Sequence, residues 1–475
     1  MIALVNGIAR SKLSLVGAVV ACVLFPVLLF SVILDAQGIV ENPYFGFLNY
    51  VILGPIFTVG LLLVIVGLFF SKGQEDIGLF TYEYIREQLT MPGRLTRVRK
   101  LIFLTICLTF VTVFTVGVFS YAGYQYSESV DFCATLCHSV MKPEYVTYLN
   151  SPHSRIRCVD CHIGTDATWY KKTKIRGIQQ IFNVAFDTYS RPIKSPITNL
   201  RPNRRVCETC HRPEKFHGDK LIVLDKFLPD EQNTHIQTVL LMRIGSAGYE
   251  RKAHGIHWHV SENNQMTYKY SDRQREKITQ VRFINSSGSE ETYTNVDADQ
   301  TKLASDTTRK MDCIDCHNRP THIFLSSNEA LDRKILNDSI PAQLPFIKRQ
   351  ALEVITKSYA SEEEADREIA DSLRNWYKEN YPTIFQQKPL LLKKAIIGVQ
   401  QAYSENVFPS MNIKWNTYKN FVGHTGGSGC FRCHNDSMQT PDGKAISCEC
   451  TKCHIILAED VPAMDLLQIL KKFGQ

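Results

Sequence analysis

The N-terminal part of the chain is dominated by long apolar stretches without charged side chains. Three of them reach about 20 residues, the length that a helix needs to cross a bilayer. They are residues 13–34, 48–71 and 101–123. A cleaved signal peptide is the alternative for the first stretch, but its apolar core is usually shorter and it leaves the other two unexplained. The pattern predicts three transmembrane helices that form a membrane anchor over residues 1–127.

Lys and Arg beside the predicted spans indicate the orientation of the anchor, because basic flanks stay in the cytoplasm. Arg10 and Lys12 precede the first span, and residues 35–41 between the first two spans contain no Lys or Arg. The next connection is basic and contains Lys72, Arg86, Arg94, Arg97, Arg99 and Lys100. We therefore expect a cytoplasmic N-terminus and an exported domain after the third span.

Apolar positions are sparser after residue 127. Residues 278–296 alternate weakly between apolar and polar side chains around Gly288, which predicts a β-hairpin. Residues 326–421 repeat apolar side chains at helical spacing and predict three helices. We find little other signal for regular sheet. The expected fold class is a membrane protein with three transmembrane helices and a mainly α exported part.

Cysteines in the exported part form pairs that each precede a histidine. The chain has 15 cysteines, of which Cys22 and Cys107 lie in predicted spans and are interpreted as small apolar residues. There are six clusters. Five have the form C-x-x-C-H, and the one nearest the N-terminus has one more residue between its two cysteines. In chain order the clusters are Cys133, Cys137 and His138; Cys158, Cys161 and His162; Cys207, Cys210 and His211; Cys313, Cys316 and His317; Cys430, Cys433 and His434; and Cys450, Cys453 and His454.

This spacing suits c-type haem for a geometric reason. Two thiols about one helical turn apart reach the two vinyl groups of one porphyrin edge, and the adjacent histidine then lies under the iron. Zinc needs four ligands and no histidine directly after the second cysteine, and disulfides leave the histidines unexplained. We therefore predict six covalently bound c-type haems. Cys448 could compete for Cys453, but the C-x-x-C spacing favours Cys450.

Each haem iron takes a second axial ligand unless it is catalytic or binds gas. The chain has 14 histidines, so eight remain after the six of the motifs. For each of the eight, a surface or structural role is the alternative. The candidate distal ligands are Met141, His153, His257, His259, His322 and His424. His217, His235 and His254 are weaker candidates, and the sequence does not assign ligands to particular haems.

The spacing of the motifs also indicates how the exported part is built. Segments as short as those around the motifs cannot bury enough apolar surface alone. We therefore expect the porphyrins to form the core and to pack closely enough to conduct electrons. The predicted parts are the anchor, residues 1–127; a four-motif domain, residues 128–325; a haem-free helical segment, residues 326–421; and a two-motif segment, residues 422–475.

The charge is mildly basic, with 54 Lys plus Arg against 47 Asp plus Glu and a formal net charge of +7. The basic residues form no continuous stripe, so a nucleic-acid partner is not indicated. Haem propionates would take up much of the basic excess, because buried carboxylates need partners.

From the third predicted span to residue 216 the sequence resembles the NapC/NirT/NrfH family of membrane-anchored multihaem cytochromes. Over its whole length it resembles the longer inner-membrane branch of metal-reducing bacteria. The resemblance implies a bacterial inner membrane location with a periplasmic haem domain. It implies oxidation of membrane quinol, with menaquinol expected, and electron transfer along the haems to periplasmic c-type cytochromes. The segments that carry it are residues 133–144, 151–153, 158–164, 207–216, 255–259 and 313–322.

The resemblance also implies residues for a quinol site. In short family members a lysine twelve residues after the second-motif histidine marks the quinol pocket, and Lys174 matches that position. An equal alternative is that Lys174 contacts lipid headgroups. Glu144 and Asp166 are further candidates for handling quinol protons. The chain departs from short members in having more predicted spans and motifs, and in placing Met141 three residues after His138 instead of two.

Three functions fit these features. The favoured one is a quinol-oxidising electron conduit, which as an enzyme would be a quinol:cytochrome c oxidoreductase (quinol dehydrogenase). The first alternative is a non-catalytic haem anchor subunit that docks a larger complex through residues 326–421. The second alternative is a terminal multihaem reductase with one open iron. Such enzymes usually carry an unusual attachment motif such as C-x-x-C-K, and the sequence has none.

Overall fold

The computed structural model describes most of the chain after residue 94 and less of it before. The described residues are 11–36, 49, 52–70, 86, 90, 95–135, 138–164, 167–197, 203–211, 218–245, 255–261, 264–285, 287–299, 301–303, 305–424, 428–464, 468 and 471. The chain divides into two units. Unit 1 comprises Met1–Met141 and Arg157–Val159, and unit 2 comprises Lys142–Ile156 and Asp160–Gln475.

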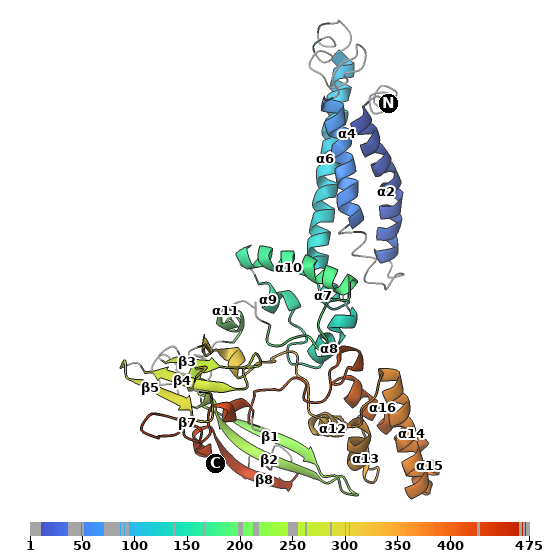
Figure 1. Ribbon diagram of the computed structural model, residues 1–475. Coiled ribbons are helices and arrows are strands. Elements are labelled where there is room, and N and C mark those ends of the chain that lie inside the picture. The colour runs from blue at the N-terminus through green and yellow to red at the C-terminus, as the bar shows by residue number, and fades with distance from the viewer. Residues whose placement is uncertain are drawn as a thin grey trace. The chain divides into compact units, whose positions relative to one another are not determined.

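Unit 1 contains three long helices, α2 (Lys12–Ala36), α4 (Gly54–Phe70) and α6 (Leu95–Ser127) (Figure 1). Small residues let α2 and α4 approach closely, as is typical of helices that pack in lipid. A Cβ atom on Gly17 would lie 2.5 Å from the carbonyl oxygen of Gly60. The hydroxyl of Ser14 in α2 donates to the carbonyl of Val64 in α4 at 3.0 Å.

The prediction of three transmembrane helices is wrong for the described residues, because one helix among them is long and apolar enough to span a bilayer. This helix is residues 12–31 of α2. The predicted second span is helical over 17 residues, or about 26 Å at about 1.5 Å per residue, short of a hydrocarbon core of about 30 Å. The predicted third span lies in α6. Over its described residues, α6 is not among the helices that are long and apolar enough to cross a bilayer.

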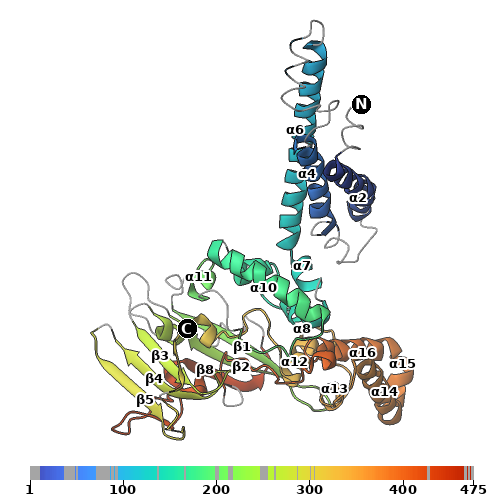
Figure 2. The same ribbon diagram turned by 45° about the horizontal axis from the view of Figure 1, so that its top comes forward.

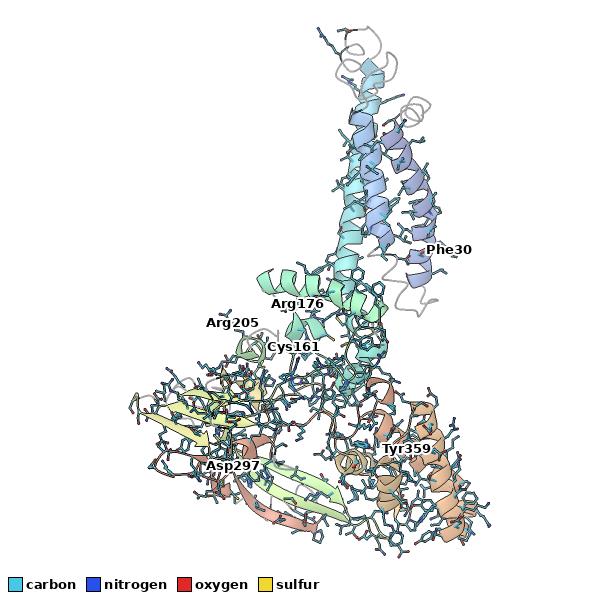
Figure 3. All side chains as sticks on the ribbon, in the orientation of Figure 1. Phe30, Cys161, Arg176, Arg205, Asp297 and Tyr359 are labelled. Atoms are coloured by element: carbon cyan, nitrogen blue, oxygen red, sulfur yellow. The ribbon has the colours of Figure 1, made fainter. Side chains whose placement is uncertain are left out.

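The apolar side chains of α2 are mostly exposed. Phe30 projects away from the neighbouring helices with 64% of its surface exposed, and Val23 is 60% exposed (Figure 3). The core helix of a soluble protein would bury such side chains. The exposed apolar surface of α2 therefore suits a membrane anchor near the N-terminus.

Eight strands among the described residues form two antiparallel sheets, so the expectation of little regular sheet is wrong. The smaller sheet has the order β1-β2-β8 and the larger one β6-β3-β4-β5-β7. The strands are β1 (Asp219–Phe227), β2 (His235–Arg243), β3 (Gln265–Tyr270), β4 (Ile278–Ile284), β5 (Glu290–Asn295), β6 (Thr307–Lys310), β7 (Met438–Gln439) and β8 (His454–Pro462).

Two strand pairings that the sequence analysis missed join segments far apart in sequence, whereas the missed β1–β2 and β3–β4 pairings are local. Gln237 of β2 pairs with Val461 of β8, and Asn295 of β5 pairs with Met438 of β7. Pairing of this kind leaves a weak local pattern, because packing against neighbours decides strand formation more than intrinsic preference does. The predicted hairpin is confirmed: β4 and β5 pair from Ile284 and Glu290 outward, around Gly288 at φ +82°.

Residues 326–421, here called the helical module, contain five α-helices instead of the predicted three. They are α12 (Ser327–Leu336), α13 (Ile347–Ile355), α14 (Glu362–Asn380), α15 (Pro382–Gln387) and α16 (Pro389–Ser404). The helix boundaries follow from the sequence. Ser326 and Glu329 form a capping box at the start of α12, and α15 and α16 each begin at a proline.

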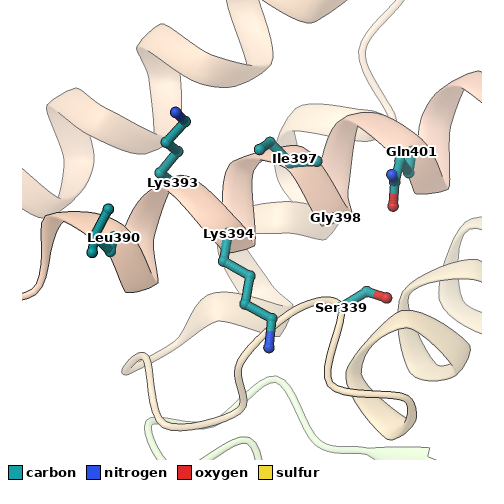
Figure 4. Close-up of a pocket in the computed structure, with 7 residues that line it drawn as sticks. All are labelled: Ser339, Leu390, Lys393, Lys394, Ile397, Gly398 and Gln401. Atoms are coloured by element: carbon teal, nitrogen blue, oxygen red, sulfur yellow. The ribbon is translucent and has the colours of Figure 1, made fainter.

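The helical module packs beside the ends of β1 and β2 (Figures 1 and 2). Asp332 of α12 accepts a hydrogen bond from the backbone N–H of Phe227 and pairs with the buried Lys348. Within the module, α16 lies directly against the loop that follows α12 (Figure 4). A Cβ atom on Gly398 would lie 2.5 Å from the carbonyl oxygen of Ser339.

Candidate functional site: opposed histidine pairs

The described cysteine motifs lie in single helical turns. The second motif forms α9 (Cys158–His162), and the third begins at the last residue of α11 (Asn203–Cys207). The later motifs lie at the short 3-10 helices η4 (Cys313–Asp315), η7 (Gly429–Arg432) and η8 (Cys450–Lys452). The backbone N–H of His317 donates to the carbonyl of Cys313 at 2.8 Å, as expected for one turn. Cys137 and the side chain of His138 lie outside the described residues.

Four motif histidines each lie near the ring of a second histidine from another segment of the chain. The rings are far enough apart to leave room for an atom between them. The pairs, with the distances between ring centroids, are His211 and His153, 5.9 Å; His162 and His322, 6.4 Å; His434 and His259, 5.7 Å; and His454 and His424, 6.1 Å. A fifth motif histidine, His317, lies within electrostatic range of His257.

Five of these histidines have their Nδ1 atom beside a backbone carbonyl oxygen. The contacts are His153 with Pro320, 3.1 Å; His257 with Ile244, 2.7 Å; His259 with Ile256, 2.9 Å; His322 with Glu144, 2.8 Å; and His434 with Ser447, 2.8 Å. A carbonyl accepts only, so in each case Nδ1 carries the proton and Nε2 keeps its lone pair. This is the usual outer-shell arrangement of histidines that bind a metal through Nε2.

The pair of His259 and His434 tests whether a metal fits. Their Nε2 atoms are 3.5 Å apart. Because both Nδ1 atoms donate to carbonyls, two lone pairs face each other and neither Nε2 can donate a hydrogen bond. Two nitrogens on opposite sides of one metal ion would lie about 4 Å apart, since each metal–imidazole bond is about 2 Å. The arrangement therefore fits a cation such as haem iron between the two rings.

Burial keeps several of these imidazoles neutral. Desolvation lowers the pKa of His162 to about 4, with a smaller contribution from His322. Burial also lowers the pKa of His259 and of His317, each next to other histidines. Neutral imidazole is the form that binds a metal.

His235 provides a contrast within the same unit. Its Nε2 lies 2.7 Å from Oδ1 of Asp225, and its ring stacks on Phe227 with 4.5 Å between centroids. Nε2 is therefore engaged by a carboxylate and is not directed at a motif histidine. His217 and His254 lie outside the described residues.

The motifs of unit 2 follow one another in space as they do in sequence. Cys207 of the third motif is close enough to Cys313 of the fourth to hydrogen-bond to it as a thiol, and Cys161 of the second motif is nearby. Cys316 of the fourth motif is close to Cys430 of the fifth. Cys430 is in turn close to Cys453 of the sixth motif. Neighbouring motifs are thus in electrostatic contact from the second to the sixth.

A buried carboxylate that the sequence analysis missed ties two motifs to the larger sheet. The side chain of Asp315, 2% exposed, lies between the cysteines of the fourth motif. It accepts hydrogen bonds from Tyr268 of β3 at 2.6 Å and from Arg309 of β6 at 3.0 Å. The guanidinium of Arg432, between the cysteines of the fifth motif, donates to the backbone carbonyl of Asp315. No local pattern signals these roles, because motif spacing leaves the intervening residues open.

Of the three candidates for the quinol site, Glu144 is the one whose side chain is among the described residues. Asp166 and the side chain of Lys174 lie outside the described residues, although Lys174 belongs to α10 (Ala167–Ala185). Glu144 of α8 (His138–Leu149) is described, and its Oε2 lies 3.3 Å from Nδ1 of His322 and 3.6 Å from Arg319. Met141 is half-buried in the same helix.

Comparison with known proteins agrees with this picture. Residues 95–221 match the N-terminal region of the NapC/NirT cytochrome c family. Over 471 residues the chain is 35% identical to the cytochrome c-type protein ImcH of Geobacter sulfurreducens, an alignment that covers 98% of this chain and 92% of ImcH. No solved structure matches the chain. The family resemblance noted in the sequence is thereby confirmed: the chain belongs to the NapC/NirT cytochrome c family, and it carries covalently bound haem.

Proposed function

We propose that this protein is a membrane-anchored cytochrome that carries six c-type haems and passes electrons from membrane quinol to periplasmic redox proteins. The observation that carries the proposal is the set of opposed histidine pairs, which recur from motif to motif. When bound, each haem supplies an iron that takes up and releases one electron.

The proposed ligands follow from the pairs. The twelve motif cysteines attach the porphyrins, and each motif histidine binds one iron. The second ligands are His322 for the second motif, His153 for the third, His257 for the fourth, His259 for the fifth and His424 for the sixth. Met141 as partner of His138 stays a prediction for the first motif.

Two protein ligands on one iron leave no position for a substrate. Four of the six proposed irons would be closed in this way by paired histidines of this chain, and His257 is the proposed second ligand at the fourth motif. The pairs therefore favour electron conduction over a terminal reductase, which needs an open iron.

Quinol oxidation requires the chain to accept two protons as well as two electrons. Lys174, Asp166 and Glu144 remain the proposed groups for this step, with Lys174 placed by its match to the family position. The basic residues before α2 support a cytoplasmic N-terminus in a bacterial inner membrane and a periplasmic haem domain. Menaquinol and periplasmic c-type cytochromes are the proposed electron donor and acceptors.

A docking role for the helical module is a second candidate, and one feature favours it. Leu390 and Ile397 of α16 are 81% and 43% exposed, beside a cavity of about 340 Å³ (Figure 4). Exposed apolar side chains of this kind often mark an interaction surface. Such a role would accompany electron conduction and need not replace it.

The test is to reduce the purified holoprotein in liposomes with a menaquinol analogue while following the haem α-band. We expect quinol to reduce the wild-type protein. We expect Lys174→Ala to slow that reduction by at least tenfold, because the quinol would lose a proton-handling group, while reduction by dithionite stays unchanged.

Lys171→Ala and Lys172→Ala are matched controls, because these residues could contact headgroups as Lys174 could. Equal slowing in all three variants would assign Lys174 to the membrane surface. No reduction of the wild type by quinol would refute quinol oxidation. A protein mass short of six haems would refute the proposed haem content.

A further inference from the structure

His322 differs from other histidines whose Nδ1 contacts a carbonyl, because a carboxylate lies beside the same nitrogen. Nδ1 is 2.8 Å from the backbone oxygen of Glu144 and 3.3 Å from Oε2 of its side chain. Within the described residues, His153, His259 and His434 have no carboxylate at this distance. One residue, Glu144, therefore offers two acceptors to one ring nitrogen.

Arg319 holds this carboxylate in place. Its Nη1 lies 3.6 Å from Oε2 of Glu144 and donates to the backbone carbonyl of His322 at 3.2 Å. The guanidinium stacks on the ring of Tyr418 at 3.7 Å, and the Arg319 side chain is 8% exposed. A buried arginine remains charged, so the carboxylate faces a permanent cation. Arg319 thus contacts both the carboxylate of Glu144 and the backbone of His322.

The carboxylate has few other neighbours to offset its charge. The Glu144 side chain is 16% exposed, and its Oε2 makes no hydrogen bond within the described residues. In that part of the chain, Arg319 and His322 are the groups at ion-pair distance from it. A charge buried in this way interacts strongly with its neighbours, because little water screens it.

A carboxylate at Nδ1 changes what Nε2 does at a metal. By attracting the Nδ1 proton it makes the imidazole a stronger donor, and outer-shell partners of this kind tune the metal. Stronger donation stabilises the ferric over the ferrous state and lowers the reduction potential. Arg319 offsets much of the Glu144 charge, so donation through His322 is the main effect.

We propose that Glu144 is a positioning residue which, through His322, lowers the reduction potential of the haem at the second motif, Cys161–His162. The inference rests on the proposed pairing of His162 and His322 and deepens it. Cys161 lies within electrostatic range of Cys207 in the third motif. A lower potential at the second motif makes onward transfer to the third more favourable and transfer from the first less favourable.

The test is a redox titration of the holoprotein, followed by absorbance and by electron paramagnetic resonance. Glu144→Gln removes the charge and leaves the backbone bond to His322 intact. We expect the potential of one haem to shift upward, the low-spin signal of one haem to change, and the other haems to keep their potentials. Glu144→Asp, which keeps the charge on a shorter side chain, should shift the same haem less.

Glu405→Gln is the matched control. Glu405 is also partly buried and pairs with Lys334 at 2.7 Å, but it belongs to the helical module. It should change no potential. The inference is overturned if Glu144→Gln retains every haem and titrates like the wild type. If Glu144→Gln does not assemble, the titration is repeated with Glu144→Ala, which also removes the charge, and an unshifted Glu144→Ala protein overturns the inference. A wild-type protein without bis-histidine low-spin signals would instead overturn the pairing on which the inference rests.

Discussion

The helical module and the cysteine motifs of unit 2 stabilise their folds in different ways. In the module, α12, α13, α14 and α16 share a core of large apolar side chains, and Leu331, Ile347 and Leu373 are completely buried. Across residues 428–454 the one buried apolar side chain other than glycine is Met438. The motif cysteines and histidines of that segment are partly or largely exposed, with Cys450 among the exposed ones.

The difference shows where the protein depends on its cofactor. Burial of large apolar side chains contributes about 2 kcal/mol each, so the module can be stable by itself. The motif segments have no comparable core, and porphyrins would supply the missing apolar surface.

Removing haem should have the largest effect, because we expect it to unfold the motif segments and to leave the helical module folded. If the chain is produced in cells that cannot attach c-type haem, we expect the motif segments to lose their fold while the helical module keeps its own. Limited proteolysis followed by mass spectrometry would then recover a fragment covering residues 326–407. A haem-free chain whose motif segments resist the protease as well as the module would contradict the comparison.

A smaller effect is expected from a cavity in the module. Leu373→Ala removes a fully buried side chain of α14. It should lower the free energy of unfolding of the module by about 4 kcal/mol. The haem spectrum should not change, because the core around Leu373 contains no motif residue.

Chemical denaturation followed by circular dichroism measures the decrease in the free energy of unfolding. Leu390→Ala is the control, since the Leu390 side chain is largely exposed, and it should leave the free energy of unfolding almost unchanged.

The smallest effect on stability is expected from a change at Asp315, whose side chain connects the fourth motif to the larger sheet. Asp315→Asn keeps the shape of the side chain but removes the charge that Arg275 and Arg309 contact. Loss of charge-assisted hydrogen bonds should lower the free energy of unfolding of the motif region by about 2 kcal/mol. Thermal unfolding followed in the haem absorption bands measures this change. Asp338→Asn, whose pair with Lys394 is exposed, should have almost no effect.

Local patterns predicted the parts of the fold that depend on near neighbours in sequence. The β4–β5 hairpin was predicted because its turn and its alternation lie within one short segment, and helices in the module were predicted from their apolar spacing. The division of the module into five helices was missed, since Pro382 and Pro389 separate α15 and α16 within one apolar stretch. In the missed sheet of β1, β2 and β8, β1 and β2 form a local hairpin with a weak apolar pattern, and β8 pairs with β2 from more than 200 positions away.

The amino-acid sequence by itself determined the chemistry of this protein: six cysteine–histidine motifs, a family, and a short set of histidines that could serve as partners. Those properties depend on which residues are present and how many positions separate them along the chain, and both are fixed before the chain folds. The tertiary structure alone decided which histidine faces which motif, that His235 is engaged by Asp225, and that Glu144 and Arg319 meet His322. Such choices join residues up to 178 positions apart, as for Glu144 and His322. They depend on packing in three dimensions, on which local sequence carries no information.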